Sequence, residues 1–135
     1  MLNLIPYTRA GAADVAHQTV GIVDADPLYR WFVTEAVAAR GIGGVEFATV
    51  ADAARFAAGG PAADLLLIDH QTLVDECANR PPPDFGALMR GCPCVLLATT
   101  EPGGEQLQFG AVVVEKPAGL ETLMELVDRR LHRAT

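Results

Sequence analysis

Two short segments of this sequence are apolar at every position, and they constrain the fold more than any other feature. Residues 65–68 end at Asp69, and residues 94–98 end at Thr99. A strand with one face in water alternates apolar and polar residues, whereas a strand covered by helices on both faces is apolar throughout. Both segments are much shorter than the roughly 20 residues that a membrane-spanning helix needs. The chain is therefore expected to form a buried parallel sheet and no membrane span.

Segments with helical periodicity separate the strand candidates. Asp26-Pro27 supplies an N-cap and a proline suited to a first helical turn. Regular alternation of strands and helices favours an α/β fold with a flavodoxin-like, doubly wound, five-stranded parallel sheet of strand order 2-1-3-4-5. The expected strands are residues 19–23, 45–48, 65–68, 94–98 and 111–114, and the expected helices are residues 28–39, 51–57, 85–90 and 119–133.

The segment between the fourth and fifth expected strands is short. Residues 100–109 contain Pro102 and the pair Gly103-Gly104, which oppose a stable helix. We expect a shortened fourth helix of one or two turns at most, with above-average mobility. Between the third and fourth strands, the proline-rich residues 81–83 are interpreted as a stiff surface loop.

Length and charge limit the classes of function. A chain of 135 residues suits one domain; residues 1–18 are interpreted as an amino-terminal arm and residues 19–135 as the domain. Ten Lys and Arg residues against seventeen Asp and Glu residues leave a formal charge of −7, which argues against a nucleic-acid or anionic membrane surface. The first residues lack the basic and apolar blocks of a secretion signal. A cytoplasmic location and a protein or small-molecule partner are expected.

Cysteine and phenylalanine residues are assigned ordinary structural roles. Cys77, Cys92 and Cys94 are odd in number and lack the spacing of a four-ligand zinc site, so reduced thiols are expected. The core is expected to include the phenylalanines Phe32, Phe56, Phe85 and Phe109.

Polar residues converge where the strands end. Asp24 and Asp69 follow the first and third strands, which flank the topological switch point of this fold. Thr99 ends the fourth strand, and Lys116, the only lysine of the chain, follows the fifth. Two neighbouring carboxylates favour a cation between them. A carboxylate nucleophile, a cation and a hydroxyl suit phosphoryl transfer with Asp69 as the acceptor, although polar strand ends of an inert domain remain the alternative.

These four polar residues lie within residues 21–30, 64–69, 95–99 and 110–117. In this order, the four segments resemble the receiver domain of bacterial response regulators, the CheY-like family. The resemblance implies that Asp69 accepts a phosphoryl group from a histidine kinase or phosphotransfer protein, that Thr99 bonds the phosphoryl oxygens, and that Lys116 pairs with them. It implies a signalling module that is not an enzyme, acts on a downstream protein, and contacts neither nucleic acid nor membrane directly.

The resemblance also implies a Mg²⁺ site, from which this sequence departs. Asp24, Asp69 and the backbone carbonyl of Gln71 would hold the ion. Ala25 occupies the position expected to supply a further direct ligand, and a methyl group has no oxygen, so a weakened affinity for Mg²⁺ is expected. In addition, Val113 stands where the family often has a switching aromatic residue.

Two other functions stay open at this point. The first is a pseudo-receiver that binds proteins without being phosphorylated, which Ala25 and Val113 favour. The second is an FMN-binding flavodoxin, which shares the topology. The first strand of this chain is not followed by a Ser/Thr/Gly-rich phosphate loop, which argues against a flavodoxin.

Overall fold

The computed structural model describes residues 18–59, 63–78, 86, 88, 91–99, 106–108, 111–116 and 119–132. Among these residues, no helix is both long enough and apolar enough to cross a membrane. The elements in chain order are β2 (Thr19–Val23), α2 (Pro27–Ala38), β3 (Gly43–Phe47), α3 (Val50–Ala58), β4 (Leu65–Asp69), α4 (His70–Glu76), β5 (Cys94–Ala98), β6 (Gln106–Gln108), β7 (Ala111–Glu115) and α6 (Leu120–His132).

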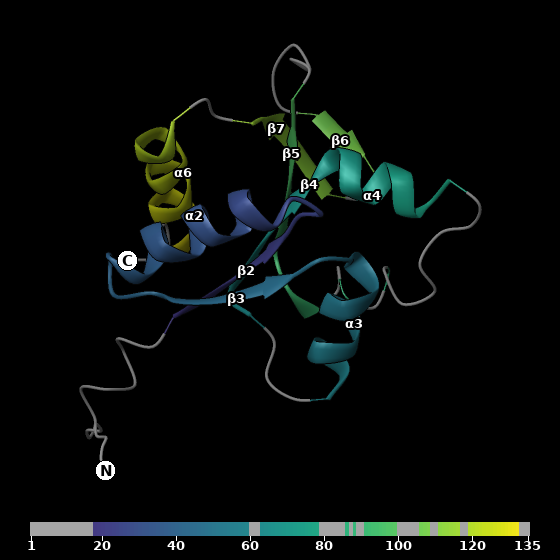
Figure 1. Ribbon diagram of the computed structural model, residues 1–135, viewed down its shortest axis with the longest axis horizontal. Helices are drawn as coiled ribbons and strands as arrows, with labels where there is room; N and C mark the ends of the chain where they lie inside the picture. Colours follow the sequence, from purple (N-terminus) through teal and green to yellow (C-terminus); the bar gives the residue numbers. More distant parts are fainter. Residues whose placement is uncertain are drawn as a thin grey trace.

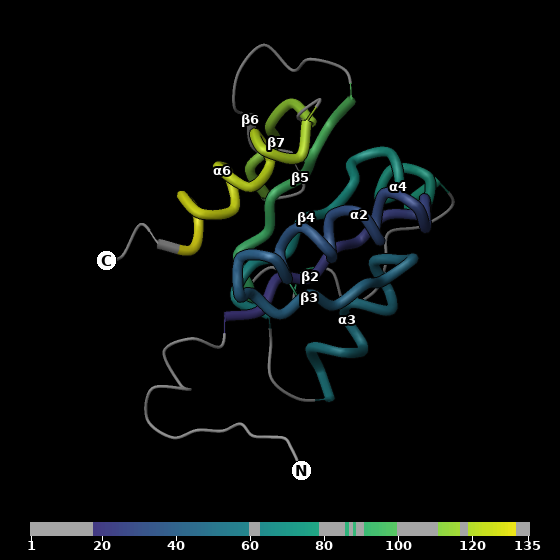
Figure 2. Tube along the Cα trace, turned by 60° about the vertical axis from the view of Figure 1, so that its left-hand side comes forward, coloured from purple at the N-terminus to yellow at the C-terminus, as the bar shows by residue number. Residues whose placement is uncertain are grey.

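The sheet has the expected parallel core and one additional strand. Its order is β3-β2-β4-β5-β7-β6, and the first five strands in this order are parallel. They reproduce the predicted order 2-1-3-4-5, which is confirmed. The additional strand β6 pairs antiparallel with β7 and lies at the edge of the sheet farthest from β3 (Figure 2). Where a short fourth helix was expected, the described residues 106–108 are thus a strand, and residues 100–105 and 109 lie outside the description.

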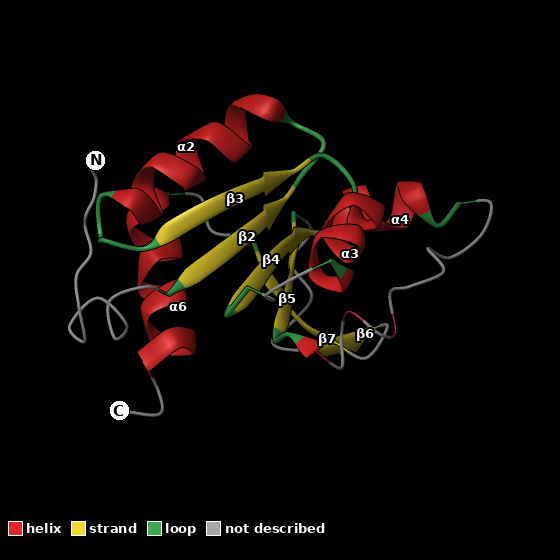
Figure 3. Cartoon of the chain, turned by 90° about the horizontal axis from the view of Figure 1, so that it is seen from below, coloured by secondary structure: helices red, strands yellow, loops and turns green. Residues whose placement is uncertain are grey.

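Helices cover both faces of the sheet. Figures 1 and 3 show α2 and α6 on one side and α3 and α4 on the other. Because successive side chains of a strand point to opposite faces, the fully apolar strands supply both cores. The α2/α6 side buries Val20, Ile22, Leu65, Leu67, Val95 and Leu97, and the α3/α4 side buries Val23, Leu66, Ile68, Leu96 and Ala98.

Strand β3 begins two residues before the predicted residue 45 and includes Gly43 and Gly44. At Gly44 a Cβ atom would lie 2.9 Å from Cγ2 of Thr34 and 3.0 Å from Cγ2 of Val37. Since real Cβ atoms do not approach that closely, glycine at this position lets α2 pack tightly on the strand.

Helix α2 begins as predicted but does not bury Phe32. The side chain of Asp26 accepts a hydrogen bond from the backbone N–H of Leu28 and caps the helix. Val33 and Val37 face the core, whereas Phe32 is 45% exposed and packs edge-on against Trp31. Phe56 of α3 is also exposed. The prediction of a buried core position was therefore wrong for both phenylalanines, while Phe85 and Phe109 lie outside the described residues.

Helix α4 was not among the helices expected from the sequence. It begins directly after β4 because Asp69 acts as its N-cap, with the side chain accepting a hydrogen bond from the N–H of Thr72. Of the helix expected over residues 85–90, only Gly86 and Leu88 are described, and the proline-rich residues 81–83 lie outside the description.

Candidate functional site

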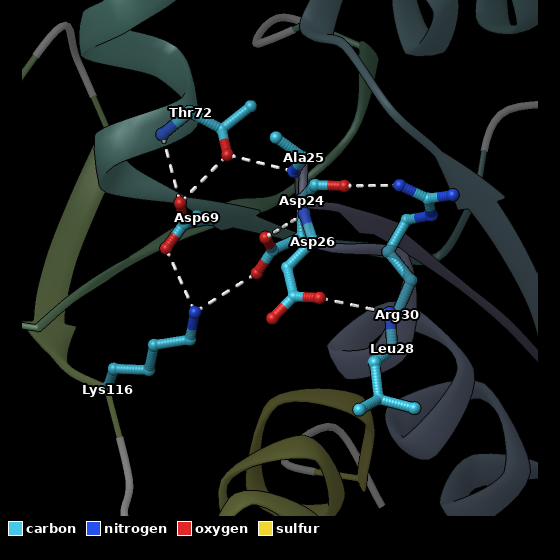
Figure 4. Close-up of polar contacts among 8 residues, drawn as sticks. All are labelled: Asp24, Ala25, Asp26, Leu28, Arg30, Asp69, Thr72 and Lys116. Carbon is cyan, nitrogen blue, oxygen red and sulfur yellow. Dashed lines mark hydrogen bonds and ion pairs between the residues drawn. The ribbon is translucent and has the colours of Figure 1, made fainter.

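The sheet brings Asp24 and Asp69 together at the carboxyl ends of adjacent strands. Strand β2 pairs with β4 so that Val23 lies beside Ile68, and the two aspartates follow these residues. Lys116 follows β7, two strands away from β4, and its backbone N–H donates to the carbonyl of Ala98 at 2.6 Å. Its side chain extends back across the sheet edge toward both aspartates (Figure 4).

Lys116 bridges the two carboxylates. Its Nζ lies 3.0 Å from Oδ2 of Asp24 and 3.0 Å from Oδ1 of Asp69. The three side chains are 15%, 6% and 11% exposed in the order Lys116, Asp24 and Asp69. These residues form the carboxylate–lysine cluster. At a site so far removed from water, removing either partner of the ion pair strongly destabilises the folded protein, because the other charge is left buried and unpaired.

The second oxygen of each carboxylate also accepts hydrogen bonds. Oδ1 of Asp24 accepts a hydrogen bond from the N–H of Asp26 at 2.9 Å. Oδ2 of Asp69 accepts two hydrogen bonds from Thr72, one from its N–H at 2.9 Å and one from its hydroxyl at 2.8 Å. Arg30 fixes the same turn, because its Nη1 donates to the backbone carbonyl of Asp24 at 2.7 Å. The carboxylates are thus held in position by groups on both sides.

Thr72 is a site residue that sequence reasoning missed. Its buried hydroxyl donates to Asp69 and accepts a hydrogen bond from the backbone N–H of Ala25 at 3.0 Å. It therefore ties the turn after β2 to the first turn of α4 (Figure 4). A usable signal was present in the sequence: Asp is a favoured N-cap residue, and its side chain commonly accepts a hydrogen bond from the N–H two or three residues later.

Tyr29 completes the surroundings of Lys116. The lysine Nζ lies 4.0 Å from the centre of the tyrosine ring, within the range of a cation–π contact. The tyrosine hydroxyl is buried and has no hydrogen-bond partner among the described residues. Burial raises the pKa of Tyr29 above its ordinary 10.0, while the nearby Lys116 charge opposes that rise.

Lys116 is a protonated ammonium group at neutral pH. Burial acts to lower its pKa, but hydrogen bonds to Asp69 and Asp24 and the attraction of both charges outweigh burial, so the pKa is raised above 10.5. The cluster therefore contains a positive charge that faces both aspartate side chains.

Two predicted site residues make no hydrogen bond to the cluster in the part of the chain that the structure describes. Thr99 is exposed at the end of β5, and among the described residues its side chain has no hydrogen-bond partner. Gln71 lies in the first turn of α4, and its side chain donates to Asp75 at 2.8 Å. The expected role of the Gln71 backbone carbonyl as a metal ligand stays a prediction.

The residues at this site do not fit a Mg²⁺ ion. The ammonium group of Lys116 lies between the two carboxylates, and Ala25 is exposed and offers no side-chain oxygen. Within the described part of the chain, no three His, Cys, Asp or Glu side chains are grouped as a metal site. A hard cation with strict octahedral geometry needs free oxygen ligands, and the described carboxylate oxygens of this cluster already have partners.

The sequence matches no family model and no curated protein. Solved structures of similar fold do exist. The N-terminal domain of a response regulator/sensory box/GGDEF three-domain protein from Carboxydothermus hydrogenoformans is 19% identical, with a TM-score of 0.66 over 87% of this chain and 96% of that chain. A response regulator receiver protein from Sinorhizobium medicae is 17% identical, with a TM-score of 0.65 over 90% and 99% of the two chains.

A response regulator from Thermotoga maritima is 18% identical, with a TM-score of 0.61 over 86% of this chain and 98% of that chain. In each case the match spans nearly the whole of the other chain. The strand order of the parallel core agrees with the topology expected from the sequence. The chain therefore has the fold of response regulator receiver domains.

Proposed function

We propose that this chain is a receiver-type signalling module in which Asp69 accepts a phosphoryl group. The observation that carries the proposal is the position of Asp69 at the switch point of the sheet, with the Lys116 ammonium 3.0 Å from its Oδ1. A nearby fixed positive charge stabilises the negative charge that a phosphoryl group brings.

Oδ1 is the proposed nucleophile of Asp69. Its partner among the described residues is Lys116, whereas Oδ2 is held by both hydrogen bonds from Thr72. In the transfer, Oδ1 forms a bond to phosphorus while the phosphorus–nitrogen bond of a phosphohistidine breaks. The electron pair of that bond stays on the imidazole nitrogen, which takes up a proton. Lys116 then pairs with the phosphoryl oxygens, and exposed Thr99 on the adjacent strand is the proposed hydroxyl partner.

Proteins are the proposed partners. One structure of similar fold is a receiver domain from a hybrid histidine kinase, 21% identical to this chain. By analogy, the phosphodonor would be a histidine kinase or a phosphotransfer protein in the cytoplasm, and a downstream protein would receive the signal. The formal charge of −7 argues against direct binding to nucleic acid. The module itself is proposed to be non-enzymatic.

A pseudo-receiver is the second candidate, and one specific observation favours it. Ala25 leaves the pocket without a further carboxylate, and the cluster is already satisfied by Lys116 and Thr72. In this alternative, Asp69 is a structural cap of α4, and partners bind the domain without any phosphorylation.

Labelling by a small phosphodonor distinguishes the two candidates. The protein would be incubated with phosphoramidate, and its intact mass measured. Asp69→Asn removes the proposed acceptor, and Asp75→Asn is the matched control because Asp75 is an exposed acid of the same helix. A receiver gains one phosphoryl group in the unmodified and Asp75→Asn proteins and none in Asp69→Asn. A pseudo-receiver gains none in any of the three.

A further inference from the structure

We propose that the ammonium group of Lys116 is the resident cation of this pocket and takes the place of a divalent metal ion, with Tyr29 as its positioning residue. The inference concerns the same pocket as the proposed function but holds whether or not Asp69 is phosphorylated. It follows from the mismatch between the residues of the cluster and the ligand set of a Mg²⁺ site.

The ammonium lies where a bridging cation would have to lie. It is 3.0 Å from one oxygen of Asp24 and 3.0 Å from one oxygen of Asp69. Two carboxylates this near to one another repel unless a positive charge separates them. Lys116 supplies that charge from within the chain, so folding alone delivers the cation to the pocket.

A divalent ion would have to displace a tethered competitor. Asp24 and Asp69 would both have to release Lys116, and the lysine is more than four-fifths buried. Mg²⁺ also loses its water ligands reluctantly. The position that could supply a further carboxylate is Ala25, whose N–H is already bonded to Thr72. Lys116 is therefore favoured over the metal, because a metal ion would have to break two ion pairs and lose water ligands without gaining a further carboxylate.

Tyr29 holds the ammonium from a third side. Its ring centre is 4.0 Å from Nζ, and a cation over an aromatic face gains attraction when both are withdrawn from water. The hydroxyl has no partner among the described residues, so the ring, and not the hydroxyl, carries this role. Tyr29→Phe should consequently preserve the position of Lys116, whereas Tyr29→Leu should not.

The chain offers a direct probe of this inference, because Lys116 is its only lysine. Incorporation of [¹⁵N]lysine places a single labelled Nζ in the protein, and its resonance reports the surroundings of the ammonium group. Mg²⁺ and the paramagnetic ion Mn²⁺ are the probes. We expect Mg²⁺ to leave the resonance of the unmodified protein unshifted, and Mn²⁺ to broaden it no more than it broadens exposed amide resonances.

Variants at Ala25 test whether a metal ion enters the pocket once the missing carboxylate is supplied. Ala25→Asp supplies the missing carboxylate, and Mg²⁺ should then shift the Nζ resonance, while Mn²⁺ should broaden it selectively. Ala25→Asn matches the size of the new side chain without its charge and should respond more weakly. Tyr29→Leu should shift the resonance without any metal, and Tyr29→Phe should retain it.

Two results would overturn the proposal. One is a Mg²⁺-dependent shift, or selective broadening by Mn²⁺, in the unmodified protein. The other is an unchanged resonance in Tyr29→Leu, which would remove the positioning role of the ring. Neither measurement involves a phosphodonor, so failure of this inference is distinguishable from failure of the proposed phosphorylation.

Discussion

Asp69 and Thr72 are joined by two hydrogen bonds, one from the backbone N–H of Thr72 at 2.9 Å and one from its hydroxyl at 2.8 Å, and both end on Oδ2 of Asp69. Asp69 is therefore at once the cap of α4 and a partner of Lys116. At the other end of α4, the Glu76 carboxylate accepts hydrogen bonds from two N–H groups in the first turn of α3. A change at Asp69 acts directly on the start of α4, which in turn is bonded to α3.

The Thr72 hydroxyl is expected to contribute to stability. Thr72→Val keeps the shape of the side chain. It leaves the Ala25 N–H without its acceptor and removes the hydrogen bond that the Thr72 hydroxyl donates to Asp69. We predict a loss of about 1–3 kcal/mol in the free energy of unfolding, measured by urea denaturation. Thr72→Ser retains the hydroxyl and should lose clearly less. Equal losses in the two variants would contradict a role for this hydroxyl.

Removal of the lysine charge should be more costly. Lys116→Met leaves Asp24 and Asp69 facing each other in a nearly buried site, and we predict a loss of about 3–5 kcal/mol in the free energy of unfolding at neutral pH. Arg55→Met is the control, because it removes an exposed ion pair with Asp52 and should change stability by about 1 kcal/mol or less. If both variants proved equally stable, the cluster would not be a significant contributor to the fold.

The raised pKa of Lys116 predicts how stability depends on pH. Folding raises this pKa above 10.5, so the cluster's contribution is fully present below that pH and is lost as pH rises through the folded-state value. Burial of Tyr29 acts with the same sign, because its pKa is raised above 10.0. Urea denaturation on both sides of pH 10.5 should show a steeper alkaline loss in the unmodified protein than in Lys116→Met. Parallel curves would contradict the raised lysine pKa.

Two of the three cysteines should be chemically inert in the folded protein. Burial raises the pKa of Cys92 to about 11 and that of Cys94 to about 12, and the thiolate is the reactive form. Cys77 is less buried, although burial also raises its pKa. Iodoacetamide at mildly alkaline pH should therefore modify Cys77 first, as peptide mapping would show. Preferential modification of Cys92 or Cys94 would indicate a different packing around β5.

The parallel sheet and the central cluster could be predicted because they depend on simple patterns. Apolar strands such as β4 identify a sheet covered on both faces, and the polar residue that follows each strand then lies at a common edge. Asp24, Asp69 and Lys116 were located in this way. Their mutual contacts agree with that prediction, whereas their chemical roles are still to be tested.

Other features depend on contacts that local patterns do not encode. No helix was expected directly after Asp69, but the side chain of Asp69 caps one and brings Thr72 into the site. In α2, the period of the helix allowed more than one buried face, and packing on the sheet selected Val33 and Val37 over Phe32. Strand β6 is short and is formed by pairing with β7. Its own sequence does not specify that pairing.

The most direct test of the whole account is intact-mass measurement after incubation with phosphoramidate, carried out in parallel with Mg²⁺ and with a metal chelator. We predict that one phosphoryl group is added to Asp69 to the same extent under both conditions, because Lys116 already supplies the positive charge of the pocket. Labelling that requires Mg²⁺ would contradict the role assigned to Lys116 as the resident cation. The absence of labelling under both conditions would contradict the phosphoacceptor role of Asp69 and favour the pseudo-receiver.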